Sequence, residues 1–82
     1  MILNIDRGHI YVQLGEKTAT IPGEMLFPAN GNMGFVVYLD QIDYWDPKSA
    51  KQVISEDEIK AIVEDIRADF SKNGHMIEFE SA

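Results

Sequence analysis

Three carboxylates lie close together in the stretch "DQIDYWDP" at residues 40–47, and two large aromatic rings lie among them. Asp40, Asp43 and Asp46 recur at every third position, with no Lys or Arg between them. Grouped carboxylates can bind a divalent cation, act as an acid–base pair in hydrolysis, or meet a basic partner protein. Each kind of chemistry demands a different spacing and a different setting, and the rest of the chain helps to choose among them.

The spacing of the aspartates argues against a metal site. Calcium loops of the EF-hand kind need oxygen ligands at every second residue, a central Gly and a late Glu. Residues 40–47 lack these features. An acid–base pair would need one carboxyl group with a raised pKa, which the residue types do not indicate. A metal-dependent enzyme that uses Asp40, Asp43 and Asp46 is therefore the least favoured of the alternatives.

The chain offers few other candidates for catalysis. His9 and His75 are its two histidines, and each lies at or beside the start of a predicted strand, where we expect it to face solvent. The serines lack the G-x-S-x-G context of a nucleophile elbow. The stretch at residues 28–34 has neither the Lys of a P-loop nor the G-x-G-x-x-G spacing. We therefore predict no catalytic residues, no metal, no cofactor and no enzymatic activity.

The composition restricts the class of protein further. The chain has 82 residues, no Cys and a formal net charge of −7. A chain of this length predicts a single domain, residues 1–82, with a small core. Nucleic acid and anionic membranes are disfavoured as partners, because contacts with phosphate require many Lys and Arg side chains. A cytoplasmic location is predicted, since there is no signal-peptide pattern and no apolar run of the roughly 20 residues that span a bilayer.

Short apolar segments predict five β-strands. Residues 9–14 alternate between apolar and polar positions, which places alternate side chains on one face. The Gly-Glu pair at residues 15–16 fits a type II′ hairpin turn, with Gly at the first central position. The Pro-Gly pair at residues 22–23 is expected to end the next strand, and residues 24–34 to form a loop. The predicted strands are residues 2–5, 9–14, 17–21, 35–39 and 76–80.

Residues 55–74 predict one amphipathic helix. Ser55 is a favourable N-cap, and Glu58 three residues later completes a capping box. Gly74 fits the left-handed position that follows the C-terminus of a helix. An apolar stripe at helical spacing is expected to face the core, and it consists of Ile59, Ile62, Val63, Ile66 and Phe70. We predict that Ile62, Ile66 and Phe70 act as structural anchors.

The predicted elements follow one another in the order β-β-β-β-α-β. This order is typical of an α+β fold of two layers. We therefore expect a mostly antiparallel sheet of about five strands, with the one amphipathic helix packed on one face of it. Residues 40–47 then lie just after the fourth strand, in the connection to the helix.

The aromatic residues of this connection have a structural interpretation. A lone Trp in a small domain usually packs in or beside the core, because its ring can bury about 150–250 Å². If residues 41–45 form one helical turn, Ile42 and Trp45 face inward while the aspartates face outward. We therefore predict that Trp45 anchors the segment. The candidate residues for contact with a partner are Asp40, Asp43, Tyr44 and Asp46.

The segments "TIPGEML", "FVVYLDQIDYWDP", "ISEDEIKAIVEDI" and "IEFE" occur in an order that resembles a family of small bacterial immunity proteins. Such proteins are encoded beside polymorphic toxins, including those of contact-dependent growth inhibition. The resemblance covers residues 20–80 and rests on a strand, a Trp-containing turn and a capped helix. It implies that the chain binds and neutralises one cognate toxin domain, without catalytic residues and without a cofactor.

The resemblance agrees with the charge of the chain. Many toxins of this kind are nucleases, and an acidic, compact protein is the physical complement of a basic substrate cleft. The expected partner is therefore a toxin protein domain, possibly a nuclease, bound through an acidic surface. A small regulatory or adaptor domain that binds another protein is the alternative. The sequence carries no prediction of the oligomeric state.

Overall fold

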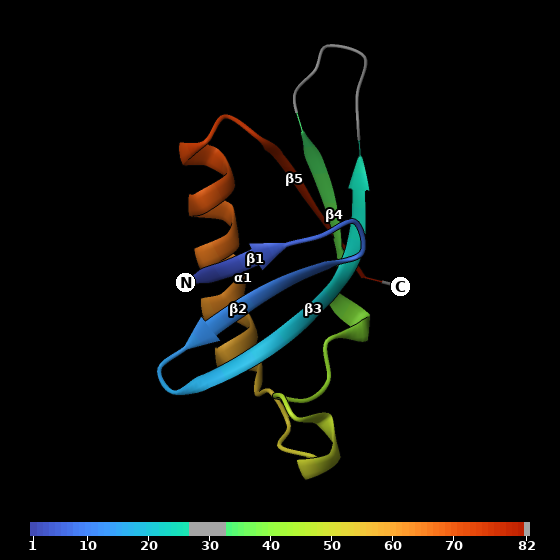
Figure 1. Cartoon of the computed structure of the whole chain (residues 1–82), viewed down its shortest axis with the longest axis vertical. Helices are drawn as coiled ribbons and strands as arrows, with labels where there is room; N and C mark the ends of the chain where they lie inside the picture. Colours follow the sequence, from blue (N-terminus) through green and yellow to red (C-terminus); the bar gives the residue numbers. More distant parts are fainter. Residues whose placement is uncertain (27–32, 82) are drawn as a thin grey trace.

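A computed structural model of the chain describes residues 1–26 and 33–81. These residues form an α+β fold with one α-helix and five strands, as the sequence predicted (Figure 1). In chain order the elements are β1 (Ile2–Ile5), β2 (His9–Leu14), β3 (Lys17–Leu26), β4 (Gly34–Tyr38), the 3-10 turns η1 (Leu39–Gln41) and η2 (Lys48–Ala50), α1 (Glu56–Lys72) and β5 (Met76–Glu80).

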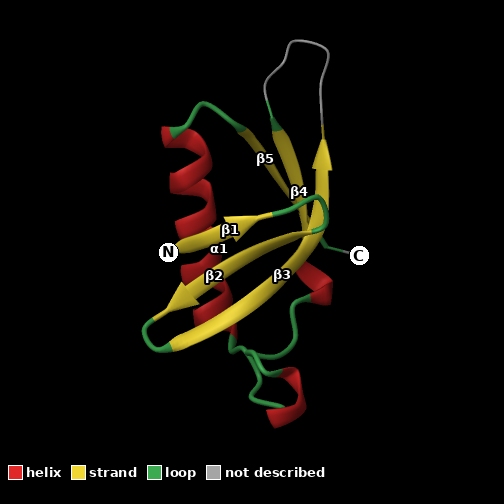
Figure 2. Cartoon of the chain, in the orientation of Figure 1, coloured by secondary structure: helices red, strands yellow, loops and turns green. Residues whose placement is uncertain are grey.

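The five strands form one sheet in the order β1-β2-β3-β4-β5. The first three pairings are antiparallel, and β4 pairs with β5 in parallel. Parallel neighbours need a long crossover connection, and the segment that contains α1 supplies it. Figure 2 shows α1 behind β1, β2 and β3. The prediction of a mostly antiparallel sheet with one helix on one face is therefore confirmed.

The hairpin between β2 and β3 follows the predicted turn chemistry. Leu14 pairs with Lys17 across a two-residue connection, and Gly15 has a φ of +63°, as a type II′ turn requires. Alternate side chains of both strands enter the core beneath α1. Those that are almost completely buried are Ile10, Val12, Ala19 and Ile21.

The prediction that residues 22–23 end the third strand was wrong, since β3 continues to Leu26. The N–H of Gly23 donates to the carbonyl of Gly8 at 2.9 Å, so His9 and Pro22 form a non-hydrogen-bonded pair. The nitrogen of Pro22 therefore points away from β2. Pairing with β4 begins only at Gly23, so the missing N–H of Pro22 costs no bond of the ladder. Residues 27–32 of the predicted loop lie outside the described residues.

Replacing Gly23 with Ala is expected to destabilise the fold by about 1–3 kcal/mol, the usual cost of overpacking a core. A Cβ at this position would overlap the carbonyl oxygen of Val36 and the ring of Phe35. Urea unfolding measures the loss. Gly8→Ala is the matched control, because a Cβ there has its nearest neighbour at 4.0 Å. Equal stability of the two variants would contradict the close packing around Gly23.

The helix is built as its sequence predicts. The hydroxyl of Ser55 accepts from the Glu58 N–H at 3.2 Å, and the Glu58 carboxylate accepts from the Ser55 N–H at 2.9 Å. Gly74 follows the C-cap with a φ of +70°. Three residues of the apolar stripe are buried, namely Ile62, Ile66 and Phe70. They pack against side chains of the sheet and against Trp45 and Ile54 of the β4–α1 connection.

Candidate functional site

Residues 41–45 do not form the helical turn that the sequence predicted. The 3-10 turn η1 ends at Gln41, and Tyr44 forms an isolated antiparallel bridge with Val53. The N–H of Trp45 donates to the carbonyl of Gln52 at 2.8 Å, and the N–H of Ile54 donates to the carbonyl of Asp43 at 2.9 Å. Gln52 and Ile54 thus satisfy the Trp45 N–H and the Asp43 carbonyl, and an extended conformation replaces the turn.

Trp45 nevertheless faces the core, and its ring is 1% exposed. The indole Nε1–H donates to the Glu58 carboxylate at 3.3 Å, and the Lys17 Nζ lies 5.5 Å from the ring centroid. Trp45 therefore connects the first turn of α1 to the start of β3. Hydrogen bonds from the Ser55 N–H, which is the largest cause, and from Trp45 hold the pKa of Glu58 below its usual value.

The three aspartates of residues 40–47 lie in different environments. Asp43 accepts from the Tyr44 N–H at 2.6 Å and from the Lys48 Nζ at 3.1 Å, and these two bonds, in that order, lower its pKa. Asp46 is half-buried and accepts from the Thr20 hydroxyl at 2.9 Å. Asp40 is exposed in η1, and Tyr44 is half-buried. A spacing of three therefore does not place these carboxylates on one helical face.

The structure brings no metal-ligand set together in the residues it describes. Among residues 1–26 and 33–81, no group of three or more Asp, Glu or His side chains is arranged to hold a metal ion. The two histidines differ in setting. His9 is exposed, while His75 is half-buried with its ring centroid 6.1 Å from that of Phe70. His9 therefore faces solvent as expected, whereas His75 faces solvent only in part.

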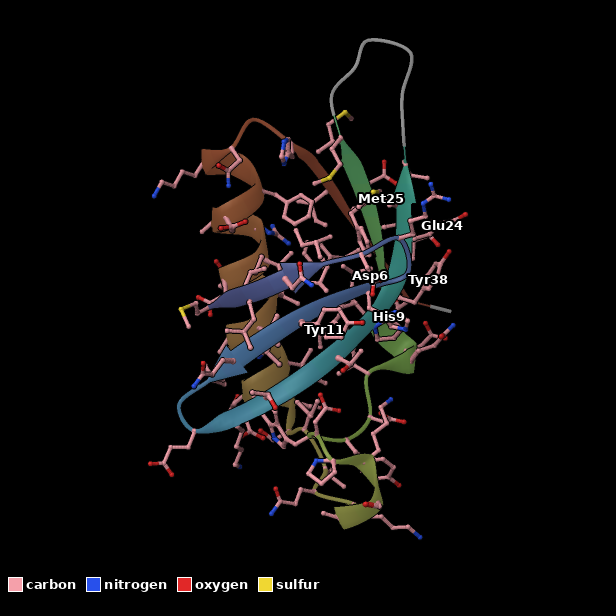
Figure 3. All side chains as sticks on the ribbon, in the orientation of Figure 1. Asp6, His9, Tyr11, Glu24, Met25 and Tyr38 are labelled. Atoms are coloured by element: carbon pink, nitrogen blue, oxygen red, sulfur yellow. The ribbon has the colours of Figure 1, made fainter. Side chains whose placement is uncertain are left out.

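The face of the sheet opposite α1 carries two carboxylate–tyrosine pairs (Figure 3). In the first, the Tyr11 hydroxyl donates to Asp6 at 2.6 Å, and the His9 Nδ1 lies 3.3 Å from the same carboxylate. The bond from Tyr11 is the main cause that lowers the pKa of Asp6, and the same bond raises the pKa of Tyr11. The Gly8 N–H also donates to Asp6, so this cluster closes the β1–β2 turn.

The second pair lies on β3 and β4, where the Tyr38 hydroxyl donates to Glu24 at 3.2 Å. This bond is the main cause that raises the pKa of Tyr38. The strand register places Glu24 and Glu78 on either side of Val36, and Glu80 beside Tyr38. Leu26 and Met76 likewise flank Gly34. We call these outward-facing side chains the outer patch, and they are Glu24, Leu26, Tyr38, Met76, Glu78 and Glu80.

Comparison with known proteins shows the family of the chain. A family model described as immunity protein 74 matches residues 2–80. The chain belongs to this immunity protein family. Comparisons with curated proteins and with solved structures found no significant match. The resemblance to immunity proteins is confirmed, and the match extends over β1 and β2, which the resemblance left out.

Immunity proteins are generally non-catalytic, so the candidate functional sites of this member of the immunity protein 74 family are its exposed surfaces. No helix in the described part of this immunity protein is both long enough and apolar enough to cross a membrane. Sequence reasoning singled out residues 40–47 and missed the outer patch. The alternation in "MIEFE" could have placed Glu78 and Glu80 on the polar face. Glu24 and Leu26 were missed because they were assigned to a loop.

Proposed function

We propose that this immunity protein binds and neutralises a cognate bacterial toxin domain in the cytoplasm of the producing cell. The match to the immunity protein 74 family over residues 2–80 is the observation that carries the proposal. The proposed system is a polymorphic toxin system such as contact-dependent growth inhibition. Neutralisation occurs by binding, with no catalytic step, no metal and no cofactor.

The proposed toxin has a basic binding surface, as a nuclease cleft does. The net charge of −7 supports this, because opposite charge steers two proteins together and raises the association rate. Asp40, Asp43, Tyr44 and Asp46 are the proposed contact residues of the β4–α1 connection. Asp40 contributes most among them, because it is exposed, whereas Asp43 already pairs with Lys48 and Asp46 with Thr20.

Co-expression with the toxin domain encoded by the adjoining gene tests the proposal. The wild-type chain is expected to restore growth of a host that the toxin otherwise kills, and to co-purify with the toxin domain. A host that carries the toxin and an empty vector is the control. Cell death despite abundant folded chain, together with no co-purification, would refute the proposed function.

The double variant Asp40→Asn, Asp43→Asn is expected to stay folded and to bind the toxin domain more slowly. Exposed carboxylates contribute little to stability, since solvent screens them. Loss of two negative charges should slow association by about threefold or more at low salt, with a smaller difference at high salt. Stopped-flow mixing at two salt concentrations measures the rates, and thermal melts measure folding.

The matched control for this variant is Asp57→Asn, Glu64→Gln, which removes the same charge from exposed positions of α1. It should slow association less, because these two carboxylates lie on α1 and are not among the proposed contact residues. Equal rates for the wild type and for the Asp40, Asp43 variant would exclude these two residues from the contact surface.

A further inference from the structure

In residues 1–26 and 33–81, the outer patch forms an exposed sheet surface with an apolar centre. Leu26 is 41% exposed and Met76 is 56% exposed, and both side chains lie next to Gly34. Their Cβ atoms lie 3.6 and 3.8 Å from the position that a Cβ on Gly34 would occupy. Gly34 itself is buried, so the two side chains close over it. Among the described residues, α1 packs on the opposite face of this sheet (Figure 1).

Negative charge surrounds this apolar centre. Glu24, Glu78 and Glu80 are exposed and project from the same face as Leu26 and Met76. The described outward-facing positions of β4, β5 and the second half of β3 contain no Lys or Arg. None of the ion pairs in the described residues involves these three glutamates.

This arrangement places three like charges on one face of the sheet. Glu24 and Glu78 flank Val36 on neighbouring strands, and Glu80 follows two residues after Glu78 on the same face. Like charges held close together on one sheet face repel one another. A cationic partner surface would remove that repulsion, whereas the phosphates of a nucleic acid would increase it.

We propose that the outer patch is the docking surface for a basic surface of the toxin protein. Leu26 and Met76 form its apolar centre, and Glu24, Glu78 and Glu80 meet Arg or Lys side chains of the toxin. Tyr38 donates to Glu24 and holds one of these carboxylates in place. The inference rests on the proposed function and names the surface that performs it. The turn η1 follows β4 directly and packs beside β3 and β5, so Asp40 lies at the margin of the same surface.

Two sets of substitutions separate the contributions of charge and of apolar contact. Glu24→Gln, Glu78→Gln, Glu80→Gln removes three negative charges and preserves the size of the side chains. The control Glu16→Gln, Asp57→Asn, Glu64→Gln removes three charges from exposed positions elsewhere, so the two variants have equal net charge. Leu26→Ser, Met76→Ser removes the apolar centre. Its control is Leu3→Ser, Val53→Ser, at positions 48% and 68% exposed.

Stopped-flow mixing with the purified toxin domain encoded by the adjoining gene measures association and dissociation rates at two salt concentrations. The patch charge variant is expected to associate about tenfold more slowly at low salt, because steering depends on local complementarity. The Leu26, Met76 variant is expected to dissociate about tenfold faster or more, since buried apolar contacts mainly set dissociation. Both controls should stay within about threefold of the wild type.

Thermal melts of every variant establish that it is folded, and exposed substitutions should change stability little. Unchanged rates for both folded patch variants, while the wild type binds, would overturn the patch and leave the proposed function intact. An equal effect of the two charge variants would also overturn it, because net charge alone would then explain binding. A wild-type chain that neither binds the toxin domain nor protects the host would refute the proposed function itself.

Discussion

Replacement of Trp45 by Ala is expected to lower the free energy of unfolding by about 3–5 kcal/mol, the usual loss for a buried large aromatic residue. The ring is 1% exposed, and it packs between the start of β3 and the first turn of α1. Its removal would leave a cavity there and would deprive Glu58 of one hydrogen-bond donor. Because Trp45 is the one Trp of the chain, circular dichroism in urea is the suitable measurement.

Two further variants control this experiment. Trp45→Phe retains most of the ring but loses the Nε1–H donor, so a loss of about 1–2 kcal/mol is expected. Val53→Ala truncates an apolar residue in the neighbouring strand of the same connection, where the side chain is 68% exposed. It should change stability by less than about 0.5 kcal/mol. If Trp45→Ala were as mild as Val53→Ala, the anchor role would be wrong.

Ile66→Ala is expected to cost about 2–5 kcal/mol, as for other buried Ile residues. Ile66 is completely buried at the centre of the apolar stripe of α1. For a domain of this size the total stability is about 5–15 kcal/mol, so the variant loses a large share of it. The same argument applies to Ile62, which is 1% exposed.

Urea unfolding of Ile66→Val and Glu64→Ala tests the mechanism. Ile66→Val removes one methyl group and should cost about 0.5–1.5 kcal/mol. Glu64 is exposed on the same helix, and Ala is a better helix former, so Glu64→Ala should be nearly neutral. A loss for Ile66→Ala no larger than for Glu64→Ala would mean that packing of this stripe does not hold the helix.

The sequence by itself determined the elements whose interactions are local. Ser55 and Glu58 cap α1 through bonds that join residues three apart, and Gly74 takes the left-handed position directly after the helix. The Gly15 turn joins β2 and β3 in the same local way. Such features depend on a few neighbouring residues, so their residue types predict them without knowledge of the rest of the fold. The α+β class follows from these elements and their order.

The tertiary structure alone decided the features that depend on distant partners. Pro22 is compatible with β3 because it faces His9 in a non-hydrogen-bonded pair and pairing with β4 begins only at Gly23. The local sequence does not specify either pairing. Residues 43–45 are extended because Gln52 and Ile54 bond the Trp45 N–H and the Asp43 carbonyl across an isolated bridge.

The outer patch depends on distant partners in the same way. Glu24 and Glu78 lie on either side of Val36 only because of the register of two strand pairings, one antiparallel and one parallel. A shift of one residue in either pairing would turn a whole strand over, so long-range register decides which carboxylates share a face.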